Sequence, residues 1–205
     1  MVACERQLLG LALACIGLLG SIISCALPTW RILTAFENFT FITFLTGSKY
    51  NKMVEGLWKT CAILPTGQTQ CTRYKDIPLP EDMKAARGLI IIAIIIEVLG
   101  ILLGVAGRNF MNFVPDERQR SKMALTSGIA FLIAGFFVLI PVSWTTNNIN
   151  DHFHPNDPKV VKKMELGAAL YIGWFTTVLL FLGGGLVCSS FFRRNGTGLT
   201  FLFFK

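Results

Sequence analysis

The sequence predicts a membrane protein, mainly α-helical, in which four transmembrane helices carry a folded region outside the bilayer. Hydrophobic residues make up 53% of the 205 residues and charged residues only 15%, a composition too apolar for an ordinary soluble domain. Four apolar runs support this prediction: residues 8–27, 88–107, 124–142 and 166–192. Each is close to the ~20 residues that cross a hydrocarbon core of roughly 30 Å.

The first apolar run is expected to remain as a helix. It follows Arg6 and contains Ser24-Cys25-Ala26, a small-residue sequence compatible with signal-peptide cleavage. The apolar core of a signal peptide spans only about 7–15 residues, however, and this uncharged run is longer. With four helices, the single domain of residues 1–205 has loops 28–87 and 143–165 on one side and segments 1–7, 108–123 and 193–205 on the other.

Charge and cysteine placement both predict which side is outside. Lys and Arg lie on both sides, but the segment 108–123 is short and dense in cations, which favours the cytoplasm. Of the six cysteines, only Cys61 and Cys71 share a water-facing loop, so one disulfide between them fits an oxidising exterior. We therefore expect cytoplasmic termini and extracellular loops 28–87 and 143–165.

The first outer loop is expected to form strands. Residues 31–36 and 38–44 are rich in β-branched and aromatic side chains, which favour extended structure. Residues 59–64 and 68–74 flank Leu64-Pro65-Thr66-Gly67, where Pro at the second and Gly at the fourth position suit a type I turn. A Cys61–Cys71 bridge would clamp this hairpin and stabilise it by about 2–3 kcal/mol in the chain-entropy model.

Two tryptophans of the same loop have alternative interpretations. Trp30 and Trp58 could be membrane-interface anchors, since Trp is enriched at headgroup level. Alternatively, they pack on the disulfide hairpin and set the angle of the sheet to the membrane. Either interpretation gives them a structural role, which is favoured over direct contact with a ligand.

Catalysis, metal binding and nucleic-acid binding find no support in the sequence. His152 and His154 lie close together in the second loop, but two histidines without a third ligand are a weak metal signal. The sequence has no Ser/His/Asp order in a plausible context, no phosphate loop and no metal cluster, so we predict no enzyme and no cofactor. The net charge of +7 comes from scattered loop cations, which does not indicate nucleic acid.

The apolar runs contain one acid and two glycine-rich faces. Glu97 lies in the middle of the second run, where a carboxyl group is costly. It is either a neutral, packed acid inside the bundle, which the sequence favours, or the mark of a functional site. Gly100-x-x-x-Gly104 and Gly183-Gly-Gly185 predict faces that allow close helix approach.

Two glycosylation sequons test the expected orientation. Asn38-Phe39-Thr40 lies in the first outer loop, so Asn38 is a candidate acceptor. Asn195-Gly-Thr197 lies in the segment expected to be cytoplasmic and should stay unmodified.

The first outer loop contains Trp30, then Gly56-Leu57-Trp58, then Cys61 and Cys71. This order of motifs resembles the claudin signature. The resemblance covers roughly residues 5–190, and its further segments are Cys71–Tyr74, Lys84-Ala-Ala-Arg87-Gly-Leu, Ile140-Pro-Val-Ser-Trp144 and Glu165–Trp174. It implies a left-handed four-helix bundle with a small antiparallel extracellular sheet, built from the first outer loop and one strand of the second.

The claudin resemblance also implies a function. Such proteins polymerise within the plasma membrane, bind themselves and other claudins in cis and in trans, and form tight-junction strands. These strands seal the space between cells or line charge-selective paracellular pores. The expected partners are therefore claudins and the lipid bilayer.

Ion selectivity in claudins depends partly on the position after the second cysteine. Here Thr72 occupies it, followed by Arg73, Tyr74 and Lys75, and Arg31 is a further candidate. Six cations and two acids lie between Arg31 and Lys75, a net charge of +4. This surplus predicts a barrier or an anion-favouring pore, and the alternative is solvated loop charge without a role in permeation.

Several segments depart from the claudin pattern. Residues Glu37–Lys52 contain an insertion, and the second loop keeps only Phe153 of the family's aromatic run, which leaves Phe153 and His154 as candidate cis or trans contacts. The chain ends in Phe201–Lys205 without the Tyr-Val carboxylate that docks in a PDZ groove, so scaffold binding is not expected. Cys188 is the remaining palmitoylation candidate. These departures leave an alternative function, a tetraspan auxiliary subunit that binds a channel or receptor.

Overall fold

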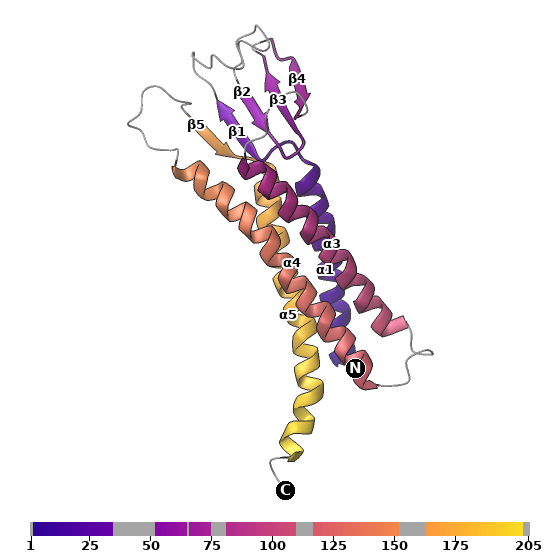
Figure 1. Cartoon of the computed structure of the whole chain (residues 1–205). Coiled ribbons are helices and arrows are strands. Elements are labelled where there is room, and N and C mark those ends of the chain that lie inside the picture. Colours follow the sequence, from indigo (N-terminus) through magenta and orange to yellow (C-terminus); the bar gives the residue numbers. More distant parts are fainter. Residues whose placement is uncertain are drawn as a thin grey trace. The chain divides into compact units, whose positions relative to one another are not determined.

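The computed structural model describes residues 2–34, 52–64, 66–74, 81–109, 117–151 and 163–202. This part of the chain forms four long helices and one five-stranded antiparallel sheet (Figure 1). The helices are α1 (Val2–Ala26), α3 (Glu81–Asn109), α4 (Glu117–Asp151) and α5 (Ala168–Leu202). The strands are β1 (Arg31–Thr34), β2 (Lys52–Glu55), β3 (Lys59–Ile63), β4 (Thr69–Arg73) and β5 (Lys163–Leu166).

All four helices contain a segment long and apolar enough to cross a membrane. These segments are Glu5–Ala26, Glu81–Gly107, Lys122–Asn150 and Ala168–Ser190. The predicted fold class, four membrane-spanning helices with a small antiparallel sheet, is therefore confirmed.

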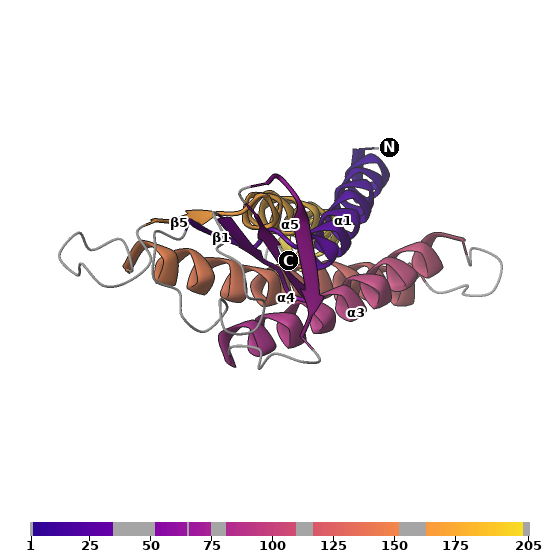
Figure 2. The same ribbon diagram turned by 90° about the horizontal axis from the view of Figure 1, so that it is seen from above.

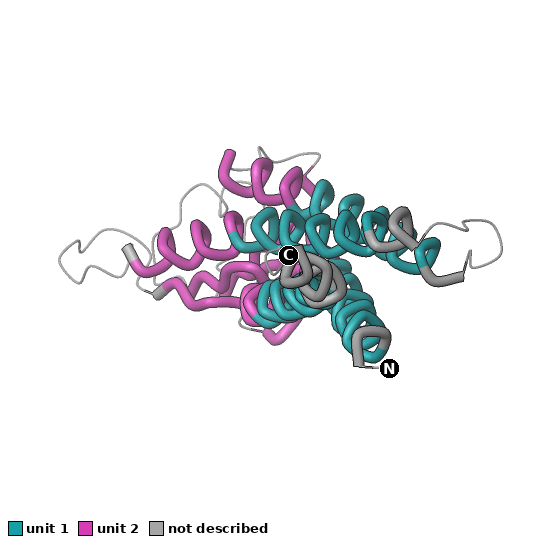
Figure 3. Tube along the Cα trace, turned by 90° about the horizontal axis from the view of Figure 1, so that it is seen from below, with its two compact units in different colours: residues 1–22, 90–139, 175–205 teal, residues 23–89, 140–174 magenta. Residues whose placement is uncertain are grey.

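The chain divides into two compact units (Figure 3). The helical unit comprises Met1–Ile22, Ile90–Leu139 and Phe175–Lys205. The sheet unit comprises Ile23–Leu89 and Ile140–Trp174, and so holds all five strands with the adjoining helix ends. Each unit is described separately below.

Buried residues of the helical unit repeat at alternating spacings of three and four. On α3 the buried positions are Ile90, Ala93, Glu97, Gly100 and Gly104. The other helices follow the same spacing, with Gly10, Ala14, Gly17 and Ser21 on α1, Ala124, Ser127, Phe131, Ala134 and Val138 on α4, and Thr176, Leu180, Gly183 and Val187 on α5. This mean period of about 3.5 residues is the pattern of helices that wrap around one another with a left-handed twist.

The glycine faces predicted from the sequence lie against neighbouring helices of this unit. A Cβ atom at Gly100 would be 2.8 Å from the Phe131 ring of α4. A Cβ atom at Gly183 would be 2.8 Å from the Gly10 carbonyl oxygen of α1, whereas Gly185 faces open space. The close approach expected from these glycines therefore occurs within the bundle for Gly100 and Gly183.

Several helix boundaries differ from the predicted ones. The helix α3 begins at Glu81 rather than at residue 88, and α1 and α4 also begin earlier than predicted. The loop predicted to begin at residue 143 is instead helical to Asp151, because Val142, Thr145 and Ile149 continue the buried spacing of α4. At the fourth helix, Leu166 pairs with Arg31 in the sheet, so α5 begins at Ala168.

The sheet has the strand order β4-β3-β2-β1-β5, and every neighbouring pair is antiparallel. Four strands come from the first loop, and β5, which lies beside β1 (Figures 1 and 2), comes from the segment before α5. This matches the composition that the resemblance implied. The predicted strand 31–36 is found as Arg31–Thr34, while the predicted strand 38–44 lies outside the described residues.

The β3–β4 hairpin has the turn that the sequence predicted. The Gly67 N–H donates to the Leu64 carbonyl at 2.9 Å, and the Leu64 N–H donates to the Gln68 carbonyl at 2.9 Å. Gly67 has a φ of 81°, the left-handed conformation that follows a type I turn in three-residue hairpin loops. Glycine is suited to this position because it has no Cβ atom.

Candidate functional site

Trp30 joins three elements of the sheet unit. Its side chain is fully buried, and its indole Nε1–H donates to the Ser24 carbonyl at 2.9 Å, one of the last carbonyls of α1 that lack a helical partner. Its backbone N–H donates to Glu55 at 2.8 Å, and its carbonyl accepts from Gly167 at 3.1 Å. Of the two interpretations given for Trp30, its burial favours packing against protein over a place among lipid headgroups.

The neighbouring residue Thr29 completes this junction. The Ala169 N–H, at the start of α5, donates to the Thr29 carbonyl at 3.0 Å. The Ser24 hydroxyl donates in turn to the Ala169 carbonyl at 2.9 Å. These bonds give partners to the Ser24 carbonyl at the end of α1 and to the Ala169 N–H at the start of α5. Polar backbone groups at helix ends otherwise lack partners within the helix.

The Gly-Leu-Trp motif forms the tip of the β2–β3 hairpin. The Gly56 N–H donates to the Lys59 carbonyl at 3.1 Å, which leaves Leu57 and Trp58 as the two connecting residues. Leu57 is fully buried, whereas 44% of Trp58 is exposed. Glycine is required at position 56 because a Cβ atom there would overlap the backbone of Pro28.

Arg87 of α3 fastens this hairpin tip. Its Nε donates to the Leu57 carbonyl at 2.9 Å, and its Nη2 donates to the same oxygen. The guanidinium carbon lies 4.5 Å from the centroid of the Trp58 ring, a cation–π distance. The structure therefore brings the signature residues at positions 56, 57, 58 and 87 into one cluster.

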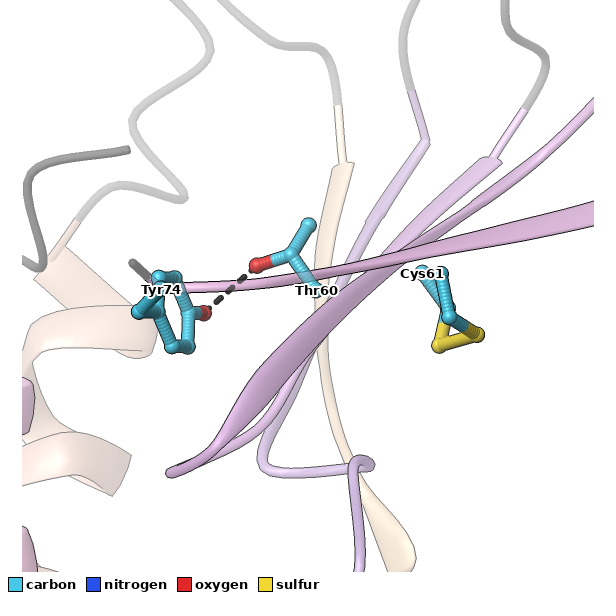
Figure 4. The surroundings of a disulfide bond; sticks show 4 residues. Thr60, Cys61 and Tyr74 are labelled. Atoms are coloured by element: carbon cyan, nitrogen blue, oxygen red, sulfur yellow. Dashed lines mark hydrogen bonds between the residues drawn. A yellow bond between two sulfur atoms is a disulfide. The ribbon is translucent and has the colours of Figure 1, made fainter. Parts of the chain in front are cut away.

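The predicted disulfide between Cys61 and Cys71 is present. The two residues are register partners in β3 and β4, so the bond clamps the hairpin at its centre. On the opposite face of β3, the Thr60 hydroxyl donates to the Tyr74 hydroxyl at 2.5 Å (Figure 4). Burial raises the pKa of Tyr74 above its ordinary value, although the bond from Thr60 acts in the opposite direction.

Arg31 is buried beside two acids, and its Nε and Nη2 have no hydrogen-bond partner among the described residues. Only 8% of the residue is exposed, and its register partner on β2 is Glu55. Its Nη2 lies 4.0 Å from Asp82 Oδ2, an oxygen that also accepts from Asn148 Nδ2 at 3.4 Å. Burial raises the pKa of Glu55, and the positive charge of Arg31 opposes that rise.

The cations of the β3–β4 hairpin are in a different environment. Lys59 and Arg73 are register partners, so their side chains share one face of the sheet at neighbouring positions. Lys59 is half-buried and Arg73 is exposed, as is every residue of β4. Neither side chain forms an ion pair with any acid among the described residues. Thr72, the position after the second cysteine, is exposed and uncharged.

Other predicted site residues are not part of this cluster. Lys75, Phe153, His154 and Asn38 lie outside the described residues, as does the insertion 37–52 apart from Lys52. Cys188 lies in α5 of the helical unit, where its Sγ atom would be 2.7 Å from a Cβ atom at Gly128. Its palmitoylation remains a prediction.

Sequence reasoning missed four polar residues of the site, namely Ser24, Glu55, Asp82 and Asn148. Ser24 is six residues before Trp30 and sits in a run that otherwise looks purely membrane-spanning. Asp82 and Asn148 come from segments far from Arg31 in the sequence. Glu55, directly before Gly56, is the only one with a local signal, since it adjoins the recognised motif.

Comparison with known proteins agrees with this geometry. The model of the PMP-22/EMP/MP20/Claudin family matches residues 5–187. Claudin-4 of Bos taurus is 44% identical over 198 residues, which are 95% of this chain and 90% of the relative. Claudin-3 of Homo sapiens is 40% identical over 186 residues, 90% of this chain and 81% of the relative.

A fish relative matches to a similar extent. The claudin-like protein ZF-A89 of Danio rerio is 39% identical over 197 residues, 96% of this chain and 91% of the relative. The family match at residues 5–187 covers parts of both units and spans the positions of the signature residues described above. The chain therefore belongs to the PMP-22/EMP/MP20/Claudin family and, within it, to the claudins, which are multi-pass structural proteins of tight junctions and not enzymes.

Proposed function

We propose that this claudin forms tight-junction strands that disfavour the paracellular passage of cations, and that the Lys59–Arg73 pair supplies the positive charge that repels them. The observation that supports this proposal is the pairing of two cations on one face of the outer hairpin, without a described acid as partner. An ion that passes this face meets two positive charges at neighbouring positions. The result is either a barrier to cations or a path that favours anions.

The size of the effect depends on how narrow the path is. One unit charge at about 4 Å is worth about 1 kcal/mol in water and about 4 kcal/mol at an effective dielectric constant of 20. Physiological salt screens exposed charges over about 8 Å. An energy of about 1 kcal/mol changes the permeability of one ion by about five-fold. A cation about 4 Å from a water-filled path would therefore lower the permeability of sodium and raise that of chloride by about this factor each. The effect becomes smaller with distance and is largely screened beyond about 8 Å.

Arg31 contributes less to this charge than its place in the sequence suggests. Arg31 is buried, and the negative charges of the adjacent acids Glu55 and Asp82 offset its positive charge. An ion in solution therefore meets little of that charge. Tyr74 accepts a hydrogen bond from Thr60. A phenol is neutral at physiological pH, and burial moves the pKa of Tyr74 further upward. We therefore assign selectivity to Lys59 and Arg73, with exposed Thr72 as a neutral neighbour.

The proposal places the sheet outside the cell. A disulfide persists in an oxidising compartment, which favours the extracellular side for Cys61 and Cys71. A gel shift after glycosidase treatment tests this orientation, since Asn38 is accessible to the glycosylation machinery only if the first loop is translocated. Glycosylation of Asn195 would contradict it.

Dilution potentials across cell layers test the charge assignment. We expect Lys59→Gln combined with Arg73→Gln to raise the permeability of sodium relative to chloride. Lys122→Gln is the matched control. Lys122 is an exposed cation near the start of α4 and lies in the segment expected to be cytoplasmic, so its replacement should leave the ratio unchanged. An unchanged ratio in the double variant, at equal junctional abundance, would reject the assignment.

Freeze-fracture of non-junctional cells that express the chain tests strand formation separately. Continuous strands are the expected result for a claudin that binds copies of itself. Isolated particles would instead favour the alternative of an auxiliary subunit for a channel or receptor.

A further inference from the structure

Among its described residues, the helical unit contains one buried acid that the junctional function does not use. Glu97 of α3 is completely buried, and the hydroxyl of Ser21 on α1 donates to its Oε1 at 2.7 Å. Its Oε2 is also buried and has no hydrogen-bond partner in the part of the chain that the structure describes.

Glu97 faces the interior of the bundle. It occupies the buried row of α3 between Ala93 and Gly100, both of which are also buried. Gly100 lies against Phe131 of α4. Because the side chain points into packed protein, the carboxyl group cannot reach the membrane surface by extending along lipid, as the long Lys and Arg side chains near helix ends do.

Among the residues that the structure describes, no cation forms an ion pair with Glu97. It is the only Asp, Glu, Lys or Arg in the four apolar runs 8–27, 88–107, 124–142 and 166–192. The helices packed in this unit present hydroxyl groups, Ser21 on α1, Ser127 on α4 and Thr176 on α5, all of them buried. The remaining titratable side chains of the runs are Cys15 and Tyr171, which are exposed, Cys25, which belongs to the sheet unit, and Cys188, which lies against Gly128.

We propose that Glu97 is an intramembrane proton-binding site, which holds its proton on Oε2 in the packed bundle and loosens the contact of α1 with α3 when the proton is lost. An ionised carboxylate here would have one hydroxyl donor and no cation, a far costlier arrangement than a neutral acid with one unpaired hydroxyl. Protonation leaves Oε1 free to accept from Ser21, as the structure shows. The bound ligand is a proton, and the element it controls is the α1–α3 contact.

The direction of the pH effect follows from this arrangement. With the proton bound, the bundle is packed and neutral, and stability is highest. As the pH rises and the proton leaves, a charge remains in an apolar interior, so the packed bundle loses stability. Replacing Glu97 by Gln keeps an acceptor for Ser21 but removes the titration.

Infrared spectroscopy of the full chain in lipid nanodiscs tests the protonation directly. The spectrum of the parent chain minus that of Glu97→Gln should contain, at neutral pH, the carbonyl stretch of a protonated carboxylic acid. Glu55→Gln is the matched control and should not remove that band, because Glu55 lies in the strand β2 of the sheet unit. A difference spectrum with only the bands of an ionised carboxylate would overturn the proposal.

Thermal unfolding at increasing pH tests the coupling to packing. The melting temperature of the parent chain should fall between neutral and alkaline pH by more than that of Glu97→Gln. Ser21→Ala should lower the melting temperature at every pH but retain the pH dependence that Glu97 causes. Identical pH profiles for the parent chain and Glu97→Gln would show that Glu97 is only a packed acid, which contradicts the proposal.

Discussion

The inner strand β1 and the outer hairpin β3–β4 carry the same kind of cation in opposite environments. Arg31 of β1 is buried, faces Glu55 across the sheet and lies 4.0 Å from Asp82. Arg73 of β4 is exposed and lies opposite a second cation, Lys59. A charge count along the loop gives both arginines equal weight, but only the hairpin presents its charge to water. Burial and pairing, rather than the number of cations, determine the charge that an ion meets.

The comparison also separates stability from selectivity within one sheet. Around β1, the bonds of Trp30 and Arg31 join the sheet to helix ends. In the outer hairpin, the disulfide holds the strands together, so the exposed side chains are free to vary. We therefore expect substitutions near β1 to affect folding and substitutions on β4 to affect permeation.

The largest expected effect on stability is that of Trp30→Ala. It removes a fully buried ring and the bond to Ser24, and truncation of a buried aromatic residue costs about 3–5 kcal/mol. Trp58→Ala is the matched control and should cost less, because 44% of Trp58 is exposed. Thermal unfolding in detergent measures both variants, and equal losses would contradict the assigned role of Trp30.

Loss of the disulfide should have the next largest effect. Replacing both Cys61 and Cys71 by Ser opens a loop with a sequence separation of 10 residues, for which the chain-entropy model gives about 2–3 kcal/mol. Cys15→Ser, in an exposed position of α1, should leave stability unchanged. In the same unfolding assay, reducing conditions should lower the stability of the parent chain to that of the double variant. A parent chain insensitive to reduction would argue against the clamp.

Arg87→Gln should destabilise the hairpin tip by about 2 kcal/mol, since hydrogen bonds to charged groups contribute about 1.5–3 kcal/mol and the stack on Trp58 adds to them. Arg87→Lys should recover only part of this loss, because an ammonium group lacks the planar guanidinium fork. Lys84→Gln, at an exposed position in the same helix, should change stability by less than about 0.5 kcal/mol. Full recovery by lysine would show that charge alone matters.

Tyr74→Phe should have the smallest effect, about 1 kcal/mol for a lost hydrogen bond from Thr60. Burial raises the pKa of Tyr74 in the folded chain above that of the unfolded chain. The neutral phenol therefore contributes stability at neutral pH that is lost as the pH rises through the raised pKa. The melting temperature of Tyr74→Phe should fall less steeply at alkaline pH than that of the parent chain. Parallel curves would contradict the pKa shift.

Local patterns were sufficient to predict much of the fold. Apolar run lengths predicted the four helices, and the positions of Pro and Gly predicted the turn at Leu64–Gly67 that the structure contains. The end of α4 was predicted too early because polar residues follow Val142, beginning with Ser143, and end the apolar run. Val142, Thr145 and Ile149 nevertheless continue the helical core spacing. Periodicity would have extended this helix where mean hydropathy did not.

The burial of Arg31 could not be predicted in the same way. Its acids come from β2 and α3, and Asn148, which bonds one of them, comes from α4. Such a cluster depends on tertiary contacts between distant segments, for which a single sequence has no local signal. The pairing of Lys59 with Arg73 was closer to prediction, since the disulfide pairing sets the register of that hairpin.

The most direct test of the account compares neutralisation of the two arginines in one assay. Dilution potentials are measured for Arg73→Gln and Arg31→Gln in cell layers with matched amounts of each variant at the junction. The account predicts that Arg73→Gln raises the permeability of sodium relative to chloride, with a change of up to about five-fold for each ion where a water-filled path passes about 4 Å from the charge. Arg31→Gln should leave the ratio close to that of the parent chain. A shift with Arg31→Gln and none with Arg73→Gln would contradict it.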